Sequence, residues 1–397
     1  MPRNKIALIS KSVITPFKVL DDSVILIDGE KITAVENQRN LAVPDGYKVV
    51  DVGKKVIAPG FIDIHNHGGL GKMVDEGGKS TILSNSKRLV ETGCTAWLPT
   101  VDSLYGIRET VSVINELTEG SRIIGIHMEG PFLTPKEIGN IKGIDYGVET
   151  PSMVKFQEFV DASEDYLKIM GVSVELEGID IIIKELKKLG IVPAVAHSTK
   201  ATYEQFMHSV HTGIRHVTHT YNVMTGLHHR KPGVVGGALT CEQVTNEIIS
   251  DGFHVSPVAM DILLRCKGIE KVCIITDNTS VAGLPDGEYE MAGATIIKEG
   301  GISRYANSTE NMDHTMAGSE WPINHNVKEM IENVGVKVCD AIRMASINPA
   351  KVIGMDSQVG SIDEGKDADI IVIDDDIKVY LTMIRGKICY DPTGLVH

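Results

Sequence analysis

The chain has 397 residues with a formal net charge of −14, and 42% of its residues are hydrophobic. This length fits a large barrel-type domain with an appendage, and the hydrophobic content excludes wholesale disorder. The acidic excess disfavours nucleic acid as a partner, and no run approaches the roughly 18 apolar residues of a membrane-spanning helix.

Both ends of the chain have the pattern of short strands joined by turns. Residues 5–58 alternate polar and apolar positions in stretches broken by Gly and Asp, with a turn at Asp28-Gly29, which is typical of an antiparallel sheet. Residues 360–391 repeat this pattern. Because chain termini often lie close together, we expect both ends to pair into one small sheet domain. The expected limits are 1–58 and 356–397 for this domain and 59–355 for the middle domain.

The middle of the chain alternates strand-length apolar runs with helical patterns that usually end at Gly. Eight such runs joined by helix-length crossovers predict a (β/α)8 barrel, with a doubly wound sheet as the alternative. Two further helices, about 321–334 and 338–346, would close the barrel. The runs are FIDIHNH (61–67), CTAWLPTV (94–101), RIIGIHME (122–129), YLKIMGVSV (166–174), IVPAVAHS (191–198), IRHVTHTY (214–221), NEIISDGFH (246–254) and KVCIITDN (271–278).

The distribution of histidine is the feature that composition leaves unexplained, because eight of the 14 lie between His197 and His254. Metal-competent ionisable residues end six of the eight runs. The catalytic groups of a (β/α)8 barrel lie at the carboxyl ends of its strands, and polar groups there are costly unless paired or ligated. The residues in question are His65 with His67, Glu129, His197, His219, Asp251 with His254, and Asp277.

These strand ends predict a site for one or two divalent metals. His65 and His67 are two apart on a strand and point to the same face, so they can share a cation. Glu129 is placed to serve one ion with His197 and His219, or to bridge two ions. Taken singly, each has an ordinary alternative: a chance H-x-H, a capping carboxylate, a hydrogen-bonded core histidine. Imidazole and carboxylate ligands favour Zn, Fe, Mn, Co or Ni over Mg or Ca.

Asp277 is predicted to act in the chemistry beside the metal. A metal lowers the pKa of its bound water, and a nearby carboxylate can take that proton and hand it to a leaving amine. Ligation of the first metal and capping of the next segment are the alternatives for this residue. His208 and His211 lie in a helical stretch and are expected to be solvated at the surface.

A basic cluster, His228-His229-Arg230-Lys231, stands out against the acidic background. Such a run is usually a solvated loop, but after the sixth strand it would lie at the mouth of the site and could bind a phosphate. Asn222 could donate to the same anion. The chain has no G-x-x-x-x-G-K-[ST] and no G-x-G-x-x-G after a strand, which removes the common nucleotide cradles.

Eight motifs follow one another in the chain: PGFIDIHNHGG (59–69), HMEGPF (127–132), AHS (196–198), HVTHTYNVMTGLHHRKPG (216–233), SDGFHV (250–255), TDN (276–278), MAGS (316–319) and the closing GSIDEGKDADIIVID. Together they resemble the N-acetylglucosamine-6-phosphate deacetylase family of the amidohydrolase superfamily. N-acetylgalactosamine-6-phosphate deacetylases share nearly every motif. The resemblance implies a (β/α)8 barrel with a small β-sandwich from both termini, and a homodimer.

The resemblance also implies roles for the metal-competent residues. Glu129, His197 and His219 would hold the principal metal. His65 and His67 match members that bind a second ion, whereas other members have Gln and Asn there and use one metal.

Further roles follow from the same resemblance. Asp277 matches the general acid/base. Arg230 matches a phosphate-binding arginine that, in the family, comes from the neighbouring subunit of a dimer. The other expected substrate contacts are Asn222, the backbone at Val223, His229, His254 and Met316.

Two positions depart from the family pattern. Many members carry K-G-x-H after the E-G-P motif, whereas this chain has Asp145 in place of that histidine. The change bears on carbonyl polarisation, on contacts with the sugar hydroxyls and on the sugar epimer. Asn278 replaces the usual Ala after the catalytic Asp, and we expect little effect from it.

The sequence therefore predicts metal-dependent hydrolysis of the N-acetyl group of N-acetylglucosamine 6-phosphate to glucosamine 6-phosphate and acetate, in amino-sugar catabolism. The alternatives are the galacto epimer as substrate and, from another class, a non-catalytic amidohydrolase-like protein, which would be expected to lose ligands. The six scattered cysteines and the lack of a signal-peptide apolar region indicate a reducing, cytoplasmic location.

Overall fold

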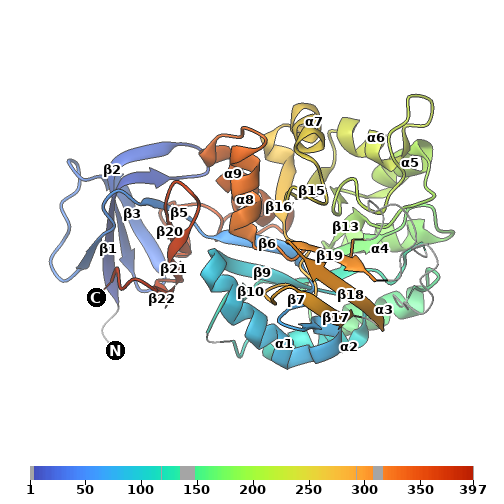
Figure 1. Cartoon of the computed structure of the whole chain (residues 1–397), viewed down its shortest axis with the longest axis horizontal. Coiled ribbons are helices and arrows are strands. Elements are labelled where there is room, and N and C mark those ends of the chain that lie inside the picture. Colours follow the sequence, from blue (N-terminus) through green and yellow to red (C-terminus); the bar gives the residue numbers. More distant parts are fainter. Residues whose placement is uncertain (1–3, 118, 135–147, 292, 307–315, 397) are drawn as a thin grey trace.

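The computed structural model describes residues 4–117, 119–134, 148–291, 293–306 and 316–396. A sheet unit built from both chain ends lies beside a larger barrel, and the two ends join in that unit where a C-terminal strand pairs with an N-terminal one (Figure 1). Asp145, on which the epimer argument depends, lies outside the described residues.

The terminal unit joins strands from both ends of the chain in the order β22-β21-β20-β5-β1-β2-β3, with β4 also paired to β1. The pairs β1–β2 and β2–β3 are antiparallel, with the expected turn after Asp28. However, β4 and β5 run parallel to β1, so the expectation of a purely antiparallel sheet for residues 5–58 is wrong. The chain returns to the β1 edge by a crossover, which parallel pairing requires. The strands are β1 (Lys5–Ile14), β2 (Val19–Asp28), β3 (Lys31–Asn37), β4 (Lys48–Asp51), β5 (Val56–Pro59), β20 (Ile370–Ile373), β21 (Val379–Ile384) and β22 (Lys387–Tyr390).

This sheet curls around a core of its own. Ile25 and Ile27 of β2 share one buried cluster with Leu381 and Met383 of β21, although three strands separate β2 from β21 in the sheet. Burying apolar faces of both halves against each other stabilises the unit by about 25 cal/mol per Å² of apolar surface removed from water. The unit is the small β domain of both termini that the sequence predicted.

The barrel consists of eight parallel strands in chain order, each overlapping one of the eight predicted runs. A bridge between Asn66 and Asn278 brings its first and last strands together. The predicted (β/α)8 fold is confirmed, and the doubly wound alternative is excluded because each strand neighbours its successor. The strands are β6 (Phe61–Asn66), β9 (Cys94–Val101), β11 (Ile126–Glu129), β12 (Leu167–Val172), β13 (Val192–Val195), β14 (His216–Val217), β15 (Thr245–Ile249) and β16 (Val272–Ile275); β10 (Arg122–Ile123) also pairs with β9.

Helices connect the barrel strands; most bury one face, whereas α6 (Gly233–Thr240) is buried nearly all round. The sequence marks several of their ends: Gly190 stops α4 in a left-handed conformation, and the Ser256 side chain accepts the Ala259 backbone N–H at the start of α7. The helices predicted near 321–334 and 338–346 are α8 and α9. The helices are α1 (Val74–Leu89), α2 (Leu104–Ile114), α3 (Met153–Ala162), α4 (Ile179–Leu189), α5 (Tyr203–Thr212), α6 (Gly233–Thr240), α7 (Pro257–Lys267), α8 (Ile323–Glu332), α9 (Val338–Met344) and α10 (Ile347–Val352), with single 3-10 turns at Val90–Thr92 and Ile269–Lys271.

Two small sheets were not foreseen. A three-stranded antiparallel sheet follows β16, formed by β17 (Gly287–Met291), β18 (Ala294–Glu299) and β19 (Ile302–Tyr305), and a short pair, β7 (Gly68–Gly69) with β8 (Lys72–Met73), follows β6. A buried ion pair between Lys298 and Glu320 attaches the three-stranded sheet to the segment before α8. Within the part of the chain that the structure describes, no helix is long and apolar enough to cross a membrane.

Candidate metal centre and active site

Six residues predicted from different strand ends meet at the carboxyl end of the barrel. Parallel strands in one barrel place their carboxyl ends on the same face, so residues far apart in sequence converge there. His65 lies in β6 and Glu129 ends β11, while the others follow β6, β13, β14 and β16. The six residues are His65, His67, Glu129, His197, His219 and Asp277.

The carboxylate of Glu129 is shared by two histidine pairs. Its Oε1 lies 3.2 Å from Nε2 of His197 and 2.7 Å from Nε2 of His219. Its Oε2 lies 3.5 Å from Nε2 of His65 and 3.2 Å from Nε2 of His67. In each trio the potential ligand atoms all lie within 4.8 Å of one another. This is the arrangement expected of a carboxylate that bridges two cations.

Asp277 faces one of these histidine pairs. Its Oδ1 lies 3.3 Å from Nε2 of His65 and 3.4 Å from Nε2 of His67. The backbone fixes this position, because the Asp277 N–H donates to the His65 carbonyl at 2.9 Å and the Asp277 carbonyl accepts from Ser319 N–H at 3.1 Å. The carboxyl group is therefore held within reach of anything bound by the two histidines.

Carboxylates raise the pKa values of the His65–His67 pair. Burial opposes the charge of His67, but hydrogen bonds and charges from Asp277 and Glu129 outweigh burial and raise the pKa of His67 to about 9. Burial also opposes the charge of His65, and the carboxylates of Asp277, Glu129 and Glu247 hold its pKa well above the ordinary value. Without a metal, protons thus balance the negative charge of this site.

The carboxylates respond in the opposite sense. Burial would raise the pKa of Asp277, but the charge of His65 and the hydrogen bond with His67 lower it to about 2. Burial likewise opposes ionisation of Glu129, but the charges of His197 and the neighbouring imidazoles keep its pKa well below the usual range. Both groups are therefore anionic at neutral pH.

This donor set fits a divalent cation. The Nε2 atoms of His65 and His67 lie 3.2 Å apart and both face the Glu129 carboxylate, so one cation could contact both rings once their protons are displaced. Imidazole nitrogens with a carboxylate are ligands that suit Zn and its first-row neighbours. Glu129, His197 and His219 would hold one ion, and His65 and His67 with Glu129 a second.

Three of the site residues occupy a strained backbone conformation. His197, His219 and Asp277 have φ values of 45°, 29° and 52°, in the left-handed region that non-glycine residues seldom adopt. Each lies two residues beyond the end of a barrel strand. Such strain concentrates at functional sites, where surrounding structure fixes it, and here it turns side chains toward the shared centre.

Beneath the site lies a buried layer that the sequence reasoning missed. Glu247 in β15 is fully buried, with its Oε2 2.9 Å from His65 Nδ1 and its Oε1 3.0 Å from His216 Nε2. His127 is buried beside them, with its Nδ1 2.9 Å from the Ile64 carbonyl. These residues lie within strands rather than at their ends. The one available signal was an ionisable residue inside an otherwise apolar strand.

Asn278, the departure from the family pattern, is buried and bonded on both sides. Its side-chain amide donates to the Trp321 carbonyl at 2.9 Å and its oxygen accepts from Arg88 at 3.2 Å. Its carbonyl accepts the His67 backbone N–H at 2.8 Å. The residue thus links the strand ends that carry His67 and Asp277.

The residues predicted to bind substrate are spread around the barrel mouth. His254 is largely buried, and its Nδ1 lies 2.7 Å from Asp251 Oδ2, so Nε2 is the ring nitrogen that this contact does not use. Asn222, Val223 and Met316 are half-buried. Asn222 donates to the carbonyl of His219 at 3.3 Å, so it is adjacent to the metal cluster.

The basic cluster forms an exposed turn. Backbone hydrogen bonds join His228 and Lys231 in both directions, and Arg230 Nη1 lies 2.7 Å from His229 Nε2. Arg230 and His229 are both exposed, and no contact of either with the six central residues is recorded within the described part of the chain.

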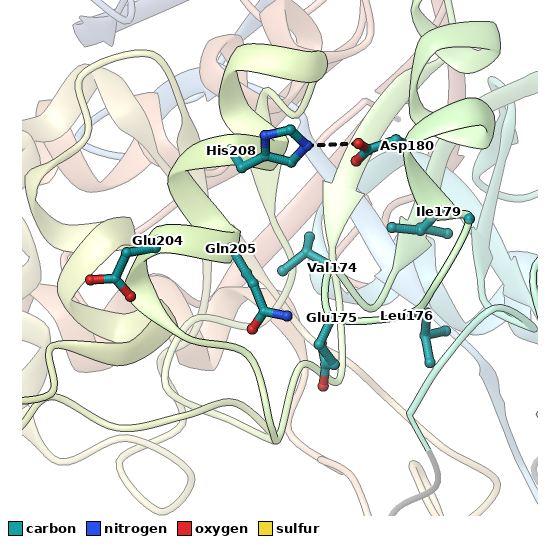
Figure 2. A pocket seen from close by; sticks show the side chains of 9 residues that line it. Val174, Glu175, Leu176, Ile179, Asp180, Glu204, Gln205 and His208 are labelled. Atoms are coloured by element: carbon teal, nitrogen blue, oxygen red, sulfur yellow. Dashed lines mark hydrogen bonds and ion pairs between the residues drawn. The ribbon is translucent and has the colours of Figure 1, made fainter.

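A surface pocket lies between the end of β12 and the starts of α4 and α5 (Figure 2). It contains none of the predicted site residues. His208, expected at the surface, is exposed and pairs with Asp180 at 2.6 Å on the wall of this pocket. His211 is also exposed, as expected.

Comparison with known proteins places the chain in a family. Residues 56–389 match the amidohydrolase family, and the chain belongs to it. It is 31% identical to the N-acetylglucosamine-6-phosphate deacetylase of Bacillus subtilis (strain 168) over 388 residues, 96% of each protein. It is 30% identical to the N-acetylgalactosamine-6-phosphate deacetylase of Escherichia coli O157:H7 over 381 residues, 93% of this chain and 95% of that protein. The crystal structure of N-acetylglucosamine-6-phosphate deacetylase from Pasteurella multocida matches with a TM-score of 0.87 at 27% identity, covering 97% of this chain and 99% of that one. The resemblance read from the motifs is confirmed.

Proposed function

We propose that the protein hydrolyses the N-acetyl group of N-acetylglucosamine 6-phosphate, giving glucosamine 6-phosphate and acetate in amino-sugar catabolism. The observation that carries this proposal is the shared Glu129 carboxylate between two histidine pairs, with Asp277 3.3 and 3.4 Å from one of them. The full-length similarity to deacetylases of amino-sugar phosphates supports the substrate class.

The protein's own groups hold the reactants and move the proton. Bound divalent metal would polarise the acetyl carbonyl and acidify the attacking water. Asp277, anionic and fixed by its backbone, accepts the proton of the water and returns it to the departing nitrogen. His254, whose Nδ1 lies 2.7 Å from Asp251 Oδ2, is the proposed second group to polarise the acetyl oxygen, a role that requires protons on both ring nitrogens. Glu129, His197, His219, His65 and His67 are the proposed metal ligands.

Phosphate recognition is assigned to the basic turn. Arg230 offers a planar fork that suits a phosphate, and its exposure on one subunit fits the proposal that it serves the site of a second subunit in a homodimer. His229 on the same turn and Asn222 and Val223 after β14 are the proposed partners on the phosphate, and Met316 lines the site. A reducing, cytoplasmic location completes the proposal and rests on the scattered cysteines of the sequence.

The galacto epimer is the second candidate substrate, because a relative with 30% identity is named for it. The test is purification, metal analysis and steady-state assays on both 6-phosphate epimers with the same enzyme stock. We expect one or two equivalents of divalent metal and a higher kcat/KM for the gluco epimer. A preference for the galacto epimer would transfer the assignment to it. Turnover of neither epimer by metal-loaded enzyme would overturn the proposed function.

A further inference from the structure

Glu247 is a carboxylate without an assigned role, buried in the centre of the barrel. It is fully buried in β15 and touches no solvent. Burying an isolated carboxylate is very costly, so a chain retains one where several donors satisfy it. Glu247 has three donors around it: His65 Nδ1 at 2.9 Å, His216 Nε2 at 3.0 Å and the His219 backbone N–H at 3.1 Å.

We propose that Glu247 is a positioning residue that fixes the ring of His65 and holds the His219 backbone, so that both metal sites are built on one buried carboxylate. This role rests on the proposed function, because it presumes that His65 and His219 bind metal. His65 points Nδ1 at Glu247 and Nε2 at Glu129, so its two ring nitrogens divide between support and ligation. Ligating histidines are commonly oriented by a carboxylate on the other ring nitrogen.

The hydrogen bonds around Glu247 argue against the simplest rival, a further cation bound by His65, His127 and Glu247. A carbonyl oxygen can only accept, so His127 Nδ1 donates to Ile64 and carries a proton. His65 Nδ1 likewise donates to the carboxylate. A cation at this trio would have to displace the proton that His65 Nδ1 donates to Glu247, so the hydrogen bonds present favour a support for the Glu129 site over a third metal site.

The contacts make an asymmetric prediction. Glu247 reaches the ring of His65, whose Nε2 belongs to the His65–His67 pair, but it reaches only the backbone of His219. Loss of its charge should therefore weaken metal binding chiefly at the site of the His65–His67 pair. A purely structural role would instead affect both sites alike.

Glu247→Gln removes the negative charge of the side chain while every hydrogen bond that the side chain makes can persist. The Gln oxygen can accept from His65 Nδ1 and the His219 N–H in place of Oε2. The Gln amide can donate to His216 Nε2, since His216 can change tautomer and keep its 2.6 Å contact between Nδ1 and Thr245 Oγ1. No buried group is left unpaired, so the variant should fold.

The test is Zn²⁺ binding to chelator-treated protein, measured by competition with a chromophoric chelator. We expect Glu247→Gln to weaken one of two Zn²⁺ equivalents by roughly 10- to 100-fold, the range typical of lost support to a ligand. In a His65→Gln/His67→Asn background, which retains the other site, the same change should have a much smaller effect. Asp369→Asn, which removes a buried carboxylate that lies just before β20 and faces Arg122, is the matched control and should leave both equivalents unchanged.

The outcomes separate this inference from the proposed function. Failure of the unsubstituted protein to bind Zn²⁺ would overturn the proposed metal site and this role together. The positioning role alone would be overturned if the unsubstituted protein binds two Zn²⁺ equivalents tightly and Glu247→Gln binds them equally tightly. It would also be overturned if Glu247→Gln weakens both sites equally and lowers the Tm. If Glu247→Gln is insoluble, Glu247→Asp serves, since its carboxylate is withdrawn by about one C–C bond, ~1.5 Å, and breaks the bond to His65. Wild-type affinity in that variant would also overturn the role.

Discussion

Metal binding to this protein should release protons, and the structure gives the number expected from one histidine pair. In the metal-free protein the pKa of His67 is raised to about 9 and that of His65 lies well above the ordinary 6.5. Near pH 7.5 both rings therefore carry two protons each. A metal must bind neutral Nε2, so loading the site formed by these histidines with Glu129 should release two protons per chain.

The sign of the pH dependence follows from the raised pKa values. His67 keeps its second proton below about pH 9, so metal binding at neutral pH still displaces it. The proton released from His67 disappears from the count as pH rises through about 9. The raised pKa of His67 also stabilises the folded, metal-free protein. This stabilisation is complete below pH 6.5, the ordinary pKa that the residue has in the unfolded chain. That stabilisation, roughly 3 kcal/mol from His67 at 1.36 kcal/mol per pKa unit, is lost as pH rises from about 6.5 to 9.

Calorimetry of Zn²⁺ binding in two buffers of different ionisation enthalpy counts the released protons. The control is the His65→Gln/His67→Asn variant, which keeps the Glu129, His197 and His219 trio. We expect the variant to release two protons fewer than the unsubstituted protein near pH 7.5. Equal proton release by the two proteins would refute the reasoning, because the pair would then be neutral before metal arrives.

Three further predictions test the site. Asp277→Asn keeps the backbone bonds to His65 and Ser319, so kcat should fall by about 10²–10⁴ with little change in Tm, and wild-type turnover would remove Asp277 from proton transfer. Glu129→Ala should purify with less metal than the unsubstituted protein, because both histidine pairs face its carboxylate, and full stoichiometric metal by elemental analysis would exclude it as a ligand. Arg230→Ala should raise KM for the phosphorylated sugar with Tm unchanged, because the side chain is exposed and makes no core contact, and an unchanged KM would contradict the phosphate role.

The sequence was most informative where polar residues interrupt a strong pattern. The apolar runs gave the barrel strands because buried parallel strands need nearly continuous apolar sequence. His65, Glu129 and Asp277 then stood out as polar groups at the ends of such runs, and barrel geometry brings those ends together whatever their separation in the chain. The six central residues could therefore be placed without coordinates.

Other features lacked such a signal. The sequences of β17 and β18 alternate polar and apolar residues only weakly, and Gly and charged residues precede them. A loop would show the same pattern, so the sequence did not predict these strands. Glu247 lies inside a strand rather than at its end, and only three-dimensional structure shows that His65 and His216 meet it. The parallel pairing of β4 with β1 depends on a crossover, and a local pattern does not report strand direction.

An acidic chain can bind an anionic phosphosugar if its negative and positive side chains lie in different places. Glu129 and Glu247 are buried, Asp277 is partly buried, and all three face imidazoles, so the site requires protons or metal cations before it can accept any anion. The phosphate charge must then be met elsewhere, and Arg230 on its exposed turn is a candidate whose attraction is weak while water surrounds it. Covering that turn with a second subunit would strengthen the attraction by excluding water. A dimer would therefore serve phosphate binding directly, and a net charge of −14 is compatible with an anionic sugar because the charges near the phosphate, rather than the net charge, decide its binding.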